Sequence, residues 1–94
     1  MNGTIVNNNR EFDCGIYVPT ESIPAGSMKE YTITFNRIFT QQPAVVASVL
    51  GTYNPVTEVS PCNVSYIGAD RFLVRIYNNY SSALTPKVCW IASL

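Results

Sequence analysis

The chain has 94 residues, enough for one small domain, and its six basic and six acidic residues leave no net charge. Hydrophobic residues make up 47% of the chain, which excludes a disordered composition, whereas charged residues make up only 13%, about half the usual share of a soluble domain. Because so few charges leave little to keep copies of the chain apart, we expect the domain to hide surface in an oligomer; an unusually neutral exterior is the alternative.

The charge pattern and the hydropathy argue against two classes of partner. The basic residues are scattered, with no run that could follow a phosphate backbone, so we expect no nucleic acid. No apolar run approaches the ~20 residues of a membrane span, so we expect no membrane insertion. Residues 1–10 are polar and asparagine-rich, unlike a secretory signal peptide, and we predict that they form a leader or linker.

The chain contains three cysteines and no histidine. An odd number means that at least one thiol is free or bridges two chains. The spacings between Cys14, Cys62 and Cys89 match no zinc motif, and without histidine we expect no metal site and no cofactor. Free cysteine often packs as a small hydrophobe, so we expect these thiols to be buried.

Several segments alternate between apolar and polar residues, as half-buried strands do. In chain order, their apolar sides consist of Phe12, Cys14 and Ile16; Tyr31, Ile33 and Phe35; Phe72, Val74 and Ile76; and Val88, Trp90 and Ala92. The segment PAVVASVL, residues 43–50, is apolar on both faces, which predicts a strand buried on both sides. The segment NVSYI, residues 63–67, is a further strand.

Loops and turns separate these strands, and helix signals are absent. Residues 18–29 and 52–62 are rich in proline and small residues, which predicts two loops, and residues 68–70 predict a tight turn. Residues 77–82, with the sequence YNNYSS, predict the turn of a hairpin between the last two strands. We therefore expect residues 11–94 to form a six- to seven-stranded antiparallel β-sandwich.

The sequence lacks most of the residue combinations that form catalytic sites. Without histidine there is no Ser-His-Asp or Cys-His pair, and the isolated glycines form no phosphate loop. Glu11 and Asp13 lie two residues apart on a predicted strand and could form a pair of carboxylates. We expect them instead to belong to an exposed charged face, and we predict that the protein is not an enzyme.

Neutral polar and aromatic residues gather in the predicted loops. They are Tyr53, Asn54, Asn78, Asn79, Tyr80, Ser81 and Ser82. Amide and hydroxyl groups pair with sugar hydroxyls, and an aromatic ring packs on the apolar face of a pyranose. The same residues also favour turns, so the composition supports sugar binding and a plain turn alike.

The order of several short motifs resembles the H-type lectin domain of snail agglutinins, discoidins and phage tail proteins. The motifs are FDCG at 12–15, YTITFNRIFTQQPAVVASVL at 31–50, NVSYIGADRFLVRIYN at 63–78 and VCWIAS at 88–93. The resemblance covers residues 12–94 and implies a six-stranded sandwich that assembles as a homotrimer. It also implies that N-acetylgalactosamine or a galactose-type sugar binds at one end, between subunits.

The resemblance names the residues that would bind the sugar. The family's acidic residue lies near Ser27, its arginine falls at Asn63, and its Trp-His pair falls at Asn79 and Tyr80, with Asn78 beside them. None of these positions keeps the family's residue. The family's first cysteine matches Cys14, but Ile76 occupies the place of its partner, so the resemblance implies that this disulfide is missing, as suits a protein that folds in a reducing cytoplasm.

Two functions follow from these observations. The first is a glycan-binding, host-recognition module of a phage or prophage tail protein, displayed on the virion tail or at an extracellular surface after release. The second is a structural trimerisation cap of a tail or fibre protein, without sugar binding. An enzyme acting on surface polysaccharide rests only on the tail-protein context and the six acidic residues, and it ranks last.

Overall fold

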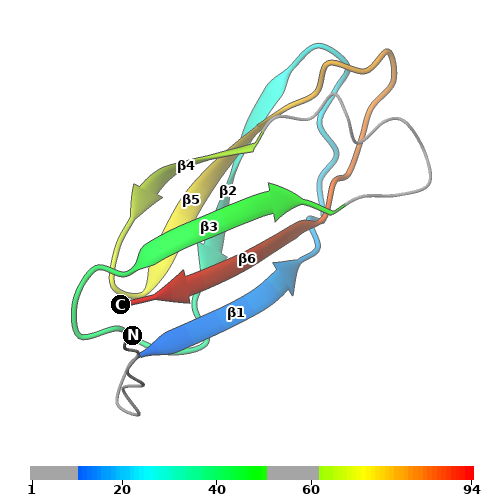
Figure 1. Cartoon of the computed structure of the whole chain (residues 1–94). Helices are drawn as coiled ribbons and strands as arrows, with labels where there is room; N and C mark the ends of the chain where they lie inside the picture. The colour runs from blue at the N-terminus through cyan, green and yellow to red at the C-terminus, as the bar shows by residue number, and fades with distance from the viewer. Residues whose placement is uncertain (1–10, 51–61) are drawn as a thin grey trace, which may run out of the picture.

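The computed structural model describes residues 11–50 and 62–94 and contains, within them, six β-strands and no helix (Figure 1). The strands are β1 (Phe12–Tyr17), β2 (Met28–Thr34), β3 (Ala44–Val49), β4 (Cys62–Ile67), β5 (Arg71–Tyr77) and β6 (Val88–Ser93). They form two three-stranded antiparallel sheets, in the orders β1-β6-β3 and β2-β5-β4. The all-β prediction is thus confirmed.

Consecutive strands β5 and β6 lie in different sheets. Residues 78–87 therefore cross from one sheet to the other, and the prediction of a hairpin there was wrong. The loop instead runs beside residues 18–27, where Ile23 N donates to Leu84 O at 2.6 Å and Leu84 N donates to Ile23 O at 3.0 Å. The turn-forming residues of segment 77–82 predict a hairpin, but the alternation of the flanking strands does not say which sheet each strand joins.

The core lies between the two sheets and is built from the alternating residues. Tyr31, Ile33 and Phe35, the three inward residues of β5, and the three of β6 are all buried. Phe35 is the centre of an aromatic cluster, with ring centroids 4.9 Å from Phe39 and 5.5 Å from both Phe72 and Trp90. The predicted apolar sides of these three segments are confirmed. Phe12, Cys14 and Ile16 also share one side, but it is the outer side of β1.

Strand β3 differs from its prediction. Val45, Ala47 and Val49 pack against the core, but Val46 on the opposite face is 73% exposed. The strand is therefore not buried on both sides. A sandwich of two sheets has two outer faces, and within the described residues no third layer covers this one.

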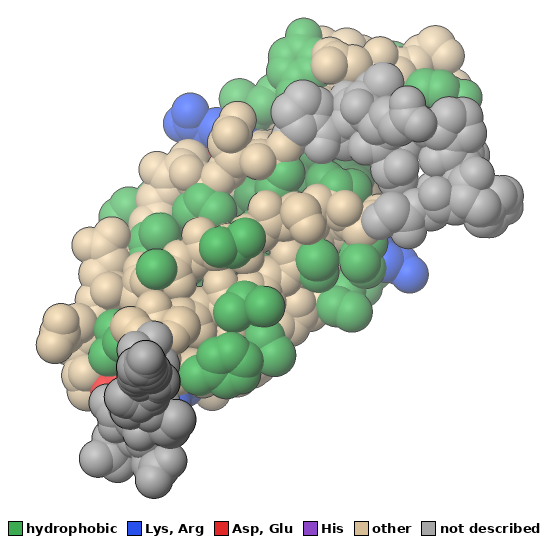
Figure 2. Space-filling model, in the orientation of Figure 1, with side chains coloured by type: hydrophobic (Ala, Val, Ile, Leu, Met, Phe, Trp, Pro, Cys, Tyr) green, Lys and Arg blue, Asp and Glu red, His purple; other side chains and the backbone are tan. Residues whose placement is uncertain are grey.

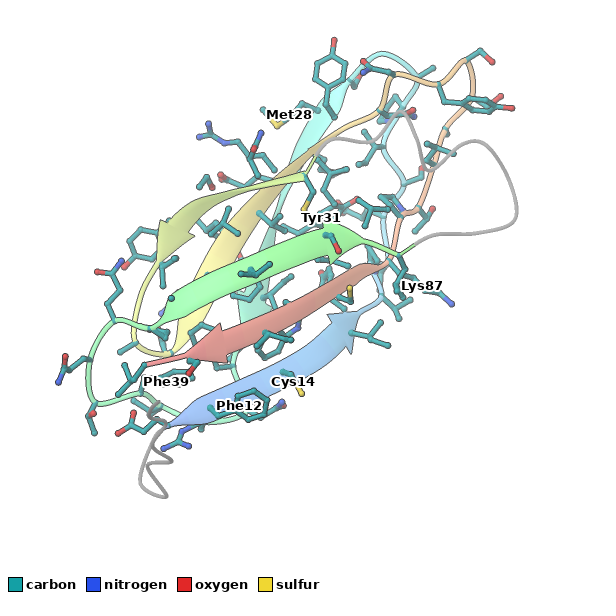
Figure 3. The ribbon with its side chains drawn as sticks, viewed as in Figure 1. Phe12, Cys14, Met28, Tyr31, Phe39 and Lys87 are labelled. Atoms are coloured by element: carbon teal, nitrogen blue, oxygen red, sulfur yellow. The ribbon has the colours of Figure 1, made fainter. Side chains whose placement is uncertain are left out.

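The outer face of the β1-β6-β3 sheet, here called the neutral face, carries no charged side chain. Its rows, set by the strand register, are Phe12, Ser93 and Ala44; Cys14, Ile91 and Val46; and Ile16, Cys89 and Ser48. Figure 2 shows hydrophobic side chains gathered over these strands, with charged side chains only toward the margins. Phe12 and Cys14 lie on this face, and Lys87 lies at its border (Figure 3).

The prediction that Glu11 and Asp13 belong to an exposed charged face was wrong. Asp13 is buried, and its carboxylate accepts hydrogen bonds from Asn36 N at 2.6 Å, Asn36 Nδ2 at 3.1 Å and Cys14 N at 3.0 Å. Glu11 accepts from Thr40 N at 2.8 Å and from Thr40 Oγ1 at 2.7 Å, and these bonds lower the pKa of Glu11. Both acids thus fasten β1 to the segment after β2.

The three cysteines are free thiols, and they are not all buried as expected. Cys14 is exposed on the neutral face, whereas Cys62 and Cys89 are half-buried. Burial raises the pKa of the Cys62 thiol. The predicted leader at residues 1–10 and most of the predicted loop at 52–62, with Tyr53 and Asn54, lie outside the described residues.

Candidate functional site

Asn78 is the fixed point of the loop that follows β5. Its side chain is fully buried, and Nδ2 donates to Ile23 O at 2.9 Å and to Ser82 O at 2.8 Å, while Oδ1 accepts from Tyr80 N at 2.8 Å. Its Oδ1 closes an Asx turn over the next two residues, and its Nδ2 links the loop to the backbone carbonyl of Ile23. Both amide hydrogens are therefore used within the protein.

The loop between β1 and β2 also holds Asn78, through hydrogen bonds to its backbone. Asn78 N donates to Ser27 O at 2.8 Å, and Gly26 N donates to Asn78 O at 2.8 Å. Gly26 has a φ of 73°, a left-handed conformation that glycine adopts at little cost, so the turn can bring its N–H to Asn78. Ser27, half-buried, therefore lies next to Asn78.

Asn79 and Tyr80 project from this fixed base. Asn79 is exposed, and Tyr80 is 37% exposed. Because Asn78 Oδ1 holds the Tyr80 backbone, the side chain of Tyr80 starts from a fixed backbone position. A partly exposed aromatic ring on a held backbone, with an exposed amide next to it, is a combination that can receive a sugar.

Asn63 lies on β4, on the exposed outer side of the β2-β5-β4 sheet, directly across from Arg75. Arg75 Nε contacts Glu30 Oε2 at 3.0 Å, and Ser65 Oγ donates to the same oxygen at 2.9 Å. The Ser65 hydrogen bond, which is the largest single cause, and the hydrogen bond and charge of Arg75 lower the pKa of Glu30. Asn63 therefore faces an ion pair rather than the 78–82 loop.

The structure brings four of the five predicted site residues together: Ser27, Asn78, Asn79 and Tyr80. Asn63 stands apart from them, in the row of Arg75, and the row of Met28 and Tyr77 lies in between. Met28 and Tyr77 are half-exposed at the loop end of their strands, and Figure 3 labels Met28 there. Sequence reasoning did not single out Arg75 and Met28, whereas Tyr77 belongs to the segment 77–82 that it did single out. The alternation of β5 placed Arg75 and Tyr77 on its outer side, but only the register shows what they face.

Other kinds of site find little support in the described residues. Among residues 11–50 and 62–94, no cluster of three or more metal-binding side chains forms, and no helix could cross a membrane. Comparison with family models, with curated proteins and with solved structures finds no match. The H-type lectin resemblance therefore remains a prediction that rests on the sequence motifs.

Proposed function

We propose that this protein is a carbohydrate-binding module of the H-type lectin kind, which recognises host glycans at the tip of a phage or prophage tail protein. The single observation that carries the proposal is the loop around Asn78. A fully buried amide holds the backbone at both ends of the loop and leaves Asn79 and Tyr80 at the surface. Preorganisation of this kind reduces the ordering cost of binding.

In this proposal, Tyr80 stacks on the apolar face of a galactose-type sugar or N-acetylgalactosamine, and the Asn79 amide pairs with its hydroxyl or acetamido groups. Asn78 is a positioning residue, because its polar atoms are engaged and buried. Ser27 flanks the loop, and Asn63 lies farther out, where it could meet a longer glycan. No cofactor is needed for such binding.

We further propose that the module works as a homotrimer whose contacts are made by the neutral face. Val46, Ile16, Phe12 and Ile91 expose between 53% and 73% of their surface there. An uncharged apolar sheet face of this kind is typical of an interaction surface, and a second copy presents an equally uncharged face. Three weak sites on one trimer would supply avidity.

Glycan-array binding by the assembled protein tests the proposal. We expect weak binding to galactose-type glycans, lost in Tyr80→Ala and kept in Tyr66→Ala, which removes another exposed tyrosine from β4. Equal binding by the wild type and Tyr80→Ala, or no signal from bacterial or animal glycans, would contradict sugar recognition by this loop.

A structural trimerisation cap is the second candidate, and the neutral face favours it, because assembly requires that face alone. This function predicts a stable trimer without glycan binding. It also predicts that the longer fibre protein loses its trimeric state when residues 12–94 are deleted. A fibre that stays trimeric after this deletion would rule the cap out.

A further inference from the structure

A pocket of about 450 Å³ lies between the two sheets, away from the 78–82 loop. On one side of the sandwich, β3 packs along β4 and closes the gap between the sheets. On the opposite side stand β1 and β2, the free edge strands of their sheets. The walls come from Gly15, Ile16 and Tyr17 of β1 and from Thr32 and Thr34 of β2, and Ile33 and Trp90 form the apolar floor.

Two contacts bound the pocket along the strands. At one end, Asp13 of β1 binds Asn36, just beyond β2, through hydrogen bonds of 2.6 and 3.1 Å. At the other end, the rings of Tyr17 and Tyr31 lie 5.8 Å apart. A cavity bounded at both ends fits a compact ring better than an extended peptide, which would need a groove open at its ends.

The edge strands turn unused backbone groups toward this side. Phe35 N donates to Asp70 O and Asn78 N donates to Ser27 O, and bonded pairs recur every second residue in an antiparallel ladder. Thr32 and Thr34 therefore direct their N–H and C=O groups away from β5. By the same alternation, starting from the bond of Leu94 N to Glu11 O, Ile16 directs its backbone groups away from β6.

Trp90 adds a buried donor to the floor. Its side chain is 95% buried, at 5% relative exposure, and its indole Nε1 lies on the side of Gly15, 3.2 Å from where a Cβ on that glycine would stand. None of the hydrogen bonds formed among residues 11–50 and 62–94 uses this N–H. Buried tryptophan N–H groups normally have a partner, so this donor is suited to an acceptor on a ligand.

We propose that this pocket binds a neutral polyhydroxylated ring of about monosaccharide size. No charged side chain lines it, so a charged ligand would have no counterion. Hydroxyl groups can both accept from Trp90 Nε1 and pair with the edge groups of Thr32 and Thr34, while the C–H face of the ring rests on Ile33. The volume lies within the range of small-molecule sites. This site is independent of the loop that carries Tyr80.

The chain has one tryptophan, so its indole N–H gives one cross-peak in a nitrogen–proton correlation spectrum. We expect D-galactose or N-acetylgalactosamine to shift this peak and the amides of Thr32 and Thr34 in a saturable manner, with a Kd on the order of 1 mM for a ligand of this size. Tyr80→Ala should keep the shift, which separates this pocket from the proposed lectin site.

Gly15→Ala should weaken the binding at least tenfold, because the added Cβ would stand 3.0 Å from Trp90 Cζ2 and narrow the floor. If that variant does not fold, the wild-type titration decides. An indole peak that stays unmoved by both sugars would overturn the proposal. So would an extended Val-Thr peptide that moves the same peaks while the sugars do not, because the pocket would then be a site of strand addition.

Discussion

The outer faces of the two sheets differ in chemistry although each sheet has three antiparallel strands. The neutral face of β1-β6-β3 carries apolar and small polar side chains, with Ile91 and Val46 in its middle row. The outer face of β2-β5-β4, here called the charged face, carries Glu30, Arg71 and Arg75, with Arg75 and Glu30 paired at 3.0 Å.

The difference shows how the few charges of this chain are distributed. A charged face is stable in water by itself, because its ions remain solvated and pair loosely. An apolar face of comparable extent gains free energy when another surface covers it. We infer that the charged face remains in solvent and that the neutral face is the one that meets a partner.

The largest expected effect comes from placing a charge on the neutral face. Val46→Glu should abolish assembly, because a carboxylate in the middle row would lose its hydration in the interface without gaining a partner. Sedimentation or light scattering should show the mass falling from about 31 kDa, three times 10.4 kDa, to that of one chain.

Ile38→Glu is the matched control for this change. Ile38 is 74% exposed and Val46 is 73% exposed, but Ile38 lies in the loop between β2 and β3 and outside the neutral face. The control should assemble like the wild type. A wild-type protein that sediments as one chain, or two variants that behave alike, would remove the neutral face from consideration as the interface.

The next largest effect concerns the buried carboxylate behind the neutral face. Asp13→Ala leaves the backbone N–H groups of Cys14 and Asn36 without their acceptor in a mostly buried place, and this should reduce the free energy of unfolding by about 3 kcal/mol. Urea unfolding measures the difference. Asp70→Asn in the turn before β5, where Asp70 pairs with Arg71 at the surface, should cost far less. Equal losses would mean that burial does not distinguish the two carboxylates.

A smaller change is expected at Asn78. Asn78→Ala removes hydrogen bonds to Ile23 O, Ser82 O and Tyr80 N, and should cost about 2 kcal/mol. Amide hydrogen exchange should accelerate at residues 79–84, while β5 keeps its protection. Asn79→Ala, which changes an exposed neighbour, should leave both measurements close to those of the wild type. Unchanged exchange in Asn78→Ala would show that the loop is held by other contacts.

The alternation of residues predicted much of the fold. The inward residues of β2, β5 and β6 follow directly from it, because successive side chains of a strand point to opposite sides. What alternation cannot decide is the partner of each strand. The segment 77–82, for which the sequence predicts a hairpin, instead leads from one sheet to the other. This happens because β5 pairs with β2 and β4 while β6 pairs with β1 and β3, and these pairings involve residues distant in sequence.

The same limit explains the remaining differences. Asp13 is buried because Asn36, 23 residues away, supplies its donors, and no local pattern announces that pairing. The two apolar faces of β3 predict burial within the chain, but an apolar face is equally compatible with burial against another copy. The loop residues Asn78, Asn79 and Tyr80 were singled out together, yet only the structure separates the buried amide from the two exposed side chains.

The smallest effect is a pH dependence that belongs to the charged face. Hydrogen bonding from Ser65 and the charge of Arg75 lower the pKa of Glu30 from its ordinary value of 4.5. Since the folded-state pKa is below the unfolded one, the stabilisation is fully present above pH 4.5 and is lost as the pH falls through the folded-state pKa. Urea unfolding at pH 6 and at pH 3 should therefore show a loss on acidification that Ser65→Ala reduces, because this variant removes the largest single cause of the pKa shift. Glu11 and Asp70, whose pKa values are also lowered, would sustain the remaining dependence in that variant. A Ser65→Ala protein with the full acid sensitivity of the wild type would show that Glu30 gains nothing from this hydrogen bond. The acid sensitivity of Glu30 would then come from its pairing with Arg75 alone.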